Sequence, residues 1–148
     1  MHTSDQLAAV KQMRAASQPN GIISLNEGDM GLFFAYPENP GLKRWLETFP
    51  VLGLSKGADP YTGRKLVALA LGAGYAHSSI KDVAMCGQMQ WRPEVKPGVV
   101  MGFGQMIKTS ELGAEDKEVI VKGLEEWSRC GDGVVGFPSM VLTAVKEG

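Results

Sequence analysis

Segments with helical periodicity and segments with strand periodicity come in groups along this chain, and this grouping constrains the fold most. Parallel sheets need strands and helices to alternate strictly, because each parallel strand is reached through a crossover. The order here is instead helix, hairpin, two helices, hairpin, helix and strand. It predicts an α+β protein with a mostly antiparallel sheet of about five strands, covered by about four helices. The predicted helices span about 3–17, 39–50, 64–72 and 114–129, and the predicted strands span 22–25, 30–36, part of 80–91, 99–107 and 134–145.

The strongest single element is the helix predicted over 114–129. Ile120, Leu124 and Trp127 recur at helical spacing and form one apolar stripe. Glu115 and Asp116 stand in its first turn, where the helix dipole favours negative charge.

Prolines and capping residues set the expected ends of several elements. Thr3 and Gln6 have the spacing of a capping box at the start of the first helix. Asn39, which a proline follows, is expected to cap the second helix, and Pro50 is expected to end it. Pro138 interrupts the last strand, so this strand is expected at a sheet edge or with a bulge.

Length, charge and cysteine content limit the class of protein. The 148 residues contain no Pro-, Ser- or charge-rich linker, so we expect one α+β domain over 1–148. The net charge of -1 argues against a general electrostatic nucleic-acid or membrane partner. Cys86 and Cys130 lack the spacing of a metal site or of a disulfide scaffold, so no metal and no cofactor are expected. Without a secretory signal or a long apolar run, the expected location is cytoplasmic.

The loop over 55–65 is the best candidate for an anion site. It holds two glycines and three cations, and it leads into a helix N-terminus that Thr62 is expected to cap, where free amides favour negative charge. It is not a Walker A loop, because five residues rather than four separate its glycines. The alternative is a solvated connecting loop with a turn at its centre. The predicted binding residues for a small anionic ligand are Lys56, Gly63, Arg64 and Lys65.

A thiol and an imidazole are the only candidates for catalysis. His77 and Cys86 are nine positions apart, and such a pair serves as base and nucleophile when the two groups touch. The sequence does not supply that contact, and cysteine is also among the residues most often simply buried. No other catalytic residue is predicted, so enzymatic activity is left open.

Aromatic side chains lead to the main functional prediction. Phe33 and Phe34 are consecutive in one predicted strand and point to opposite faces of it, so one of them faces away from the core. Trp91 stands at the end of another predicted strand. Exposed apolar side chains of this size need a partner or a ligand. We therefore predict a non-enzymatic binding or assembly module that forms a homo-oligomer or docks into a larger complex through these three residues. The alternative is a small-molecule enzyme or ligand-binding protein that uses the 56–65 loop with His77 or Cys86.

Overall fold

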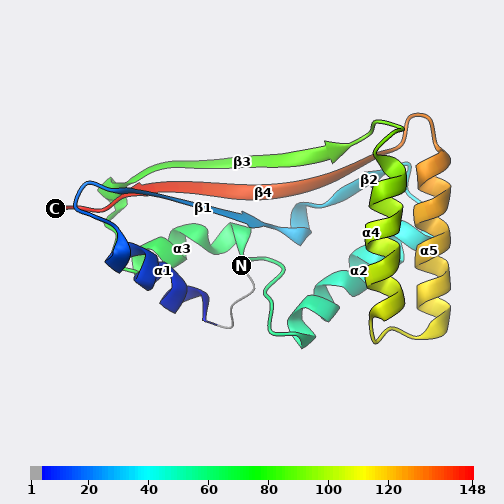
Figure 1. Cartoon of the computed structure of the whole chain (residues 1–148), viewed down its shortest axis with the longest axis horizontal. Helices are drawn as coiled ribbons and strands as arrows, with labels where there is room; N and C mark the ends of the chain where they lie inside the picture. The colour runs from blue at the N-terminus through cyan, green and yellow to red at the C-terminus, as the bar shows by residue number, and fades with distance from the viewer. Residues whose placement is uncertain (1–4) are drawn as a thin grey trace. The chain divides into compact units, whose positions relative to one another are not determined.

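The computed structural model describes residues 5–148, and this part of the chain forms five α-helices and one four-stranded antiparallel sheet (Figure 1). The α+β class agrees with the prediction, with one helix more and one strand fewer than expected. The helices are α1 (Gln6–Ala16), α2 (Pro40–Ser55), α3 (Leu66–Gly72), α4 (Lys96–Thr109) and α5 (Ala114–Arg129), and the strands are β1 (Ile22–Gly28), β2 (Phe34–Tyr36), β3 (Ile80–Gln90) and β4 (Val134–Val145).

The chain packs as two compact units, each built from segments that are distant in the sequence. Unit 1 contains the residues up to 32 together with 56–87 and 138–148, and unit 2 contains 33–55 and 88–137. Each unit has a hydrophobic core of its own. The organisation of 1–148 as a single domain stays a prediction.

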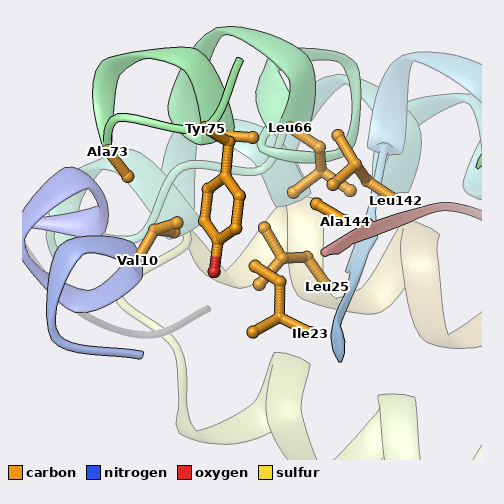
Figure 2. Close-up of a cluster of buried hydrophobic side chains, with 9 residues drawn as sticks. Val10, Ile23, Leu25, Leu66, Ala73, Tyr75, Leu142 and Ala144 are labelled. Carbon is orange, nitrogen blue, oxygen red and sulfur yellow. The ribbon is translucent and has the colours of Figure 1, made fainter. Parts of the chain in front are cut away.

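The core of unit 1 lies between two helices and the sheet. α1 and α3 lie along one face of β1 and of the adjoining part of β4 (Figure 1). Ile23 and Leu25 of β1 are buried whereas Ile22 and Ser24 are exposed, which is the alternation expected of a strand covered on one face. Figure 2 shows the Tyr75 ring among these aliphatic side chains. The buried cluster comprises Val10, Ile23, Leu25, Leu66, Ala70, Ala73, Tyr75, Leu142 and Ala144.

The hairpin predicted from 22–25 and 30–36 is wrong, because both strands pair with β4 instead of with each other. β1 is antiparallel to β4 over its whole length, from Ile22 opposite Val145 to Gly28 opposite Ser139. β2 is antiparallel to the first residues of β4. The residues read as a turn, 26–29, largely continue β1. Pairing with a distant strand lets both sets of inward-facing side chains reach the core, and this tertiary gain overrides the local turn signal.

The core of unit 2 is formed by three helices and the strand segments that they cover. α5 packs against both α2 and α4, and its bounds are those predicted from the sequence. Trp45 and Trp127 are fully buried there. The rings of Trp45 and Phe103 lie 4.6 Å apart in an edge-to-face arrangement, which adds to the apolar burial. The buried cluster comprises Leu42, Trp45, Ile107, Ile120, Leu124, Trp127 and Val135.

The strand predicted over 99–107 is wrong, because this segment belongs to α4. The strand prediction placed Val99, Met101 and Phe103 on one face. In the structure Met101 is 74% exposed, whereas Val99 and Phe103, four positions apart, pack against the core of unit 2 with Ile107. Valine and glycine lower the intrinsic helix propensity of this segment, and the spacing of four that packing selects outweighs it.

β4 has the predicted bounds but not the predicted edge position. It pairs with β1, β2 and β3, so it is the central strand of the sheet. Pro138 lies between the β4 residues that pair with β2 and those that pair with β1, so its missing N–H interrupts neither of these two ladders. Its carbonyl accepts a hydrogen bond from the Asp29 N–H at 3.2 Å.

The cap predicted for the second helix is confirmed, but its predicted end is wrong. The Asn39 side-chain oxygen accepts the Leu42 N–H at 2.8 Å, as an N-cap does. α2 then continues through Pro50 as far as Ser55. Pro50 is itself buried, so its packing offsets the one helical hydrogen bond that its ring removes.

The other two predicted caps have different outcomes. Thr3 lies outside the described residues, and α1 is capped by Asp5, whose carboxylate accepts the Ala8 N–H at 2.8 Å. Thr62 makes no capping hydrogen bond, because its hydroxyl donates to the Asp59 carbonyl. A short 3-10 turn, Gly63–Lys65, precedes α3 in its place.

Candidate functional site

The loop predicted to bind an anion is held by a buried carboxylate. Asp29, at the end of β1, is 1% exposed, and its two oxygens accept four hydrogen bonds. The Arg64 guanidinium donates two of them at 2.6 Å each. The Arg64 N–H donates a third at 3.1 Å, and the Gly31 N–H donates the fourth at 2.9 Å. This paired geometry ties the 3-10 turn before α3 to the sheet of unit 1.

The Asp29–Arg64 pair perturbs the ionisation of both groups. The hydrogen bonds from Arg64 lower the pKa of Asp29 below its usual value, against the opposing effect of burial. The same contact raises the pKa of Arg64. Next to it, the ion pair with Lys65 lowers the pKa of Asp59. Two of the three cations in the loop therefore already have carboxylate partners within the chain.

Anion binding by this loop stays a prediction, and the geometry shows what an anion would have to displace. Arg64 and Lys65 would have to leave Asp29 and Asp59. Gly63 has a packing role, because a Cβ there would lie 2.9 Å from the Glu27 carbonyl oxygen. α3 is only seven residues long, so its N-terminus offers a short dipole at most.

The two catalytic candidates both lie in unit 1, but no contact joins them. His77 is exposed in the 3-10 turn His77–Ser79, and its ring makes no hydrogen bond or ion pair within the described part of the chain. Cys86 is an exposed free thiol on β3, and its sulfur lies 3.2 Å from the Ser139 hydroxyl. Among the residues that the structure describes, neither group has the base, nucleophile or orienting partner that a catalytic pair needs at hydrogen-bond distance. A catalytic role for either residue stays a prediction.

The three predicted interface residues all lie in unit 2, and they differ in exposure. Phe33 packs edge-to-face on Trp45, with ring centroids 4.6 Å apart, so it serves the core. Phe34 is 44% exposed, and its ring lies so close to Gly136 that a Cβ there would clash with it. Trp91 is 53% exposed beneath the guanidinium of Arg92.

β3 carries exposed apolar side chains that were not predicted from the sequence. In unit 1, Val83 is 43% exposed and Met85 is 67% exposed. Within residues 5–148, β3 pairs with β4 alone, so its other edge has no strand partner. Sequence reasoning found only the later part of this strand, although the alternation that marks Met89 and Trp91 begins at Val83. The exposed residues from 81 to 87 are Lys81, Asp82, Val83, Met85, Cys86 and Gly87.

Lys96 is a buried charged residue that sequence reasoning did not find. It is 1% exposed at the start of α4, and its ammonium donates to the Cys130 carbonyl. That carbonyl lies at the C-terminal end of α5, where a positive charge is favourable. The same ammonium lies 5.2 Å from the centre of the Trp127 ring. Lys96 thus joins two helices of unit 2, and nothing in the local sequence distinguishes it from a surface lysine.

No model of a known protein family matches the chain, and no curated protein shows detectable similarity to it. Residues 5–148 contain no group of three or more histidine, cysteine, aspartate or glutamate side chains placed to hold a metal ion. None of the described helices is both long enough and apolar enough to span a membrane.

Proposed function

We propose that this protein is a non-enzymatic assembly module that self-associates by pairing β3 of one copy with β3 of a second copy. The observation that supports the proposal is the exposure of β3. In β1 every second residue from Ile23 to Leu25 is buried, whereas from Lys81 to Gly87 only Ala84 is even half-buried. Such a strand gains little from its own chain apart from its pairing with β4.

The outer edge of β3, which has no strand partner within residues 5–148, lacks most of the devices that usually protect an edge. Soluble proteins guard exposed edges with short strands, prolines, bulges or charges. β3 is 11 residues long, and its only charges, Lys81 and Asp82, stand at its beginning. From 83 to 87 it has neither a charge nor a proline. The unpaired N–H and C=O groups of this stretch are available to another strand.

A second copy is a suitable partner because this stretch complements itself. In an antiparallel pair with the two-fold axis at Ala84, Val83 of each copy lies opposite Met85 of the other on one face. Lys81 then lies opposite Gly87, and Asp82 opposite Cys86, so no like charges meet. Two-fold pairing uses the same surface on both subunits, and this is the commonest symmetry of oligomers.

Replacing Met85 by lysine is expected to dissociate the dimer. The substitution places one positive charge from each copy beside the shared edge, and a charge there is what keeps natural edges monomeric. Sedimentation velocity on the wild-type and variant chains measures the effect. We expect the variant to sediment as a monomer at concentrations where the wild type is dimeric, while its circular dichroism is unchanged.

The matched control is Met101→Lys. Met101 is the more exposed of the two methionines, at 74%, and it belongs to α4 rather than to a strand. This variant should remain dimeric. If Met85→Lys leaves the dimer intact, or if both variants dissociate it equally, β3 is not the surface that joins the copies.

A further inference from the structure

A pocket in unit 2 lies beside two of the aromatic residues already described. It is an open hollow of about 240 Å³ between β2 and the first turns of α2. Its apolar wall is held in place, because Phe33 packs on Trp45 and Phe34 lies over Gly136. The lining residues are Phe33, Phe34, Ala35, Glu38, Lys43 and Leu46.

The pocket also carries one charge of each sign. Glu38 and Lys43 line it, both are exposed, and neither side chain has a hydrogen-bond or ion-pair partner within residues 5–148. The adjacent Arg44 differs, because its guanidinium binds the Asp116 carboxylate at 2.7 and 3.0 Å. A carboxylate and an ammonium without partners, beside an apolar wall, are groups that a ligand of complementary charge would pair.

We infer that this pocket binds a free amino acid with an apolar side chain. The side chain would lie against the two phenylalanines and Leu46, where burial of apolar surface supplies the affinity. Lys43 would pair with the ligand carboxylate, close to the N-terminus of α2, and Glu38 would pair with the ligand ammonium. The volume lies below the usual range of roughly 300–1,000 Å³ for drug-sized ligands, which favours a ligand as small as an amino acid. This binding does not depend on self-association.

Calorimetric titration of the full chain with three related compounds tests the inference. L-Phenylalanine carries both charges, 3-phenylpropanoate lacks the ammonium, and phenethylamine lacks the carboxylate. We expect phenylalanine to bind with a Kd on the order of 0.1 mM. Each of the other two should bind up to roughly fivefold more weakly, because each loses one exposed ion pair.

Two neutralising variants assign the charges to their partners. Lys43→Gln should weaken phenylalanine binding roughly fivefold and leave phenethylamine binding unchanged. Glu38→Gln should do the converse, leaving 3-phenylpropanoate binding unchanged. Lys11→Gln, on the exposed face of α1 in unit 1, is the control and should alter none of them. Absence of phenylalanine binding, equal binding of the three compounds, or binding that neither variant changes would overturn the inference.

Discussion

Replacing Gly123 by alanine is expected to lower the free energy of unfolding of unit 2 by about 3 kcal/mol. A Cβ at this position would lie 2.6 Å from the Gly41 Cα and 2.5 Å from the Asn39 side-chain oxygen. Neither neighbour can move easily. Gly41 is helix backbone, and Asn39 both caps α2 and donates to the Gly123 carbonyl at 2.9 Å. The substitution would therefore force α2 and α5 apart where Gly41 and Gly123 meet.

Urea unfolding followed by tryptophan fluorescence measures this effect, because all three tryptophans belong to unit 2. Gly102→Ala is the matched control, since Gly102 also lies in a helix of unit 2 but a Cβ there would have nothing within 4 Å. The control should gain up to about 1 kcal/mol, because alanine favours helix more than glycine does. Equal effects of the two substitutions would show that the close approach of the two helices is not a constraint on the fold.

Replacing Asp29 by asparagine is expected to destabilise unit 1 by about 2 kcal/mol. Asparagine has the same shape, but its NH₂ group replaces one of the two carboxylate oxygens. The Gly31 and Arg64 donors that bind this oxygen in the wild type would then face another donor. The charge-assisted bonds from Arg64 are lost as well. We take a value below that for a fully buried pair, because the Arg64 side chain is 53% exposed and water screens it. Unit 1 contains no tryptophan, so faster amide hydrogen exchange in β1 and α3 is the appropriate readout.

The pH dependence of this difference follows from the lowered pKa of Asp29. A carboxyl group with a lower pKa in the folded state stabilises the fold above its unfolded pKa, which is about 3.9. That contribution is lost as the pH falls through the folded pKa. The difference in the free energy of unfolding between the wild type and Asp29→Asn should thus be constant near neutrality and shrink below about pH 4. A difference that persists unchanged into acid would contradict the assigned role of the Asp29 carboxylate.

The control is Lys65→Met, which removes only the more exposed pair with Asp59. This variant should lower the free energy of unfolding by less than about 1 kcal/mol.

Local sequence signals predicted the elements that depend on local interactions. The apolar stripe of Ile120, Leu124 and Trp127 predicted α5, and the predicted bounds agree with the observed ones. Asn39 correctly predicted the start of α2. These signals act within one or two turns of helix, so the rest of the fold cannot cancel them easily. By contrast, α4 was read as a strand, because short apolar runs with glycine suit either structure until their packing partners are known.

Long-range features could not be predicted from the sequence in this way. The partner of β1 lies at the opposite end of the chain, and the nearer turn signal was misleading. Asp29 and Arg64 are 35 positions apart, and neither stands in a motif. The exposed part of β3 had a readable alternation from Val83 onward. Its exposure nevertheless depends on how the rest of the chain packs around it, and one sequence does not reveal that.

The most direct test of the proposed function is the solution mass of the unmodified chain, measured by light scattering across a dilution series. Self-association through β3 predicts a mass near twice that of one 15.9 kDa chain at high concentration, falling toward the mass of a single chain on dilution. A mass of one chain at every concentration, up to the millimolar range, would contradict the account and leave the edge of β3 without a second copy as its partner.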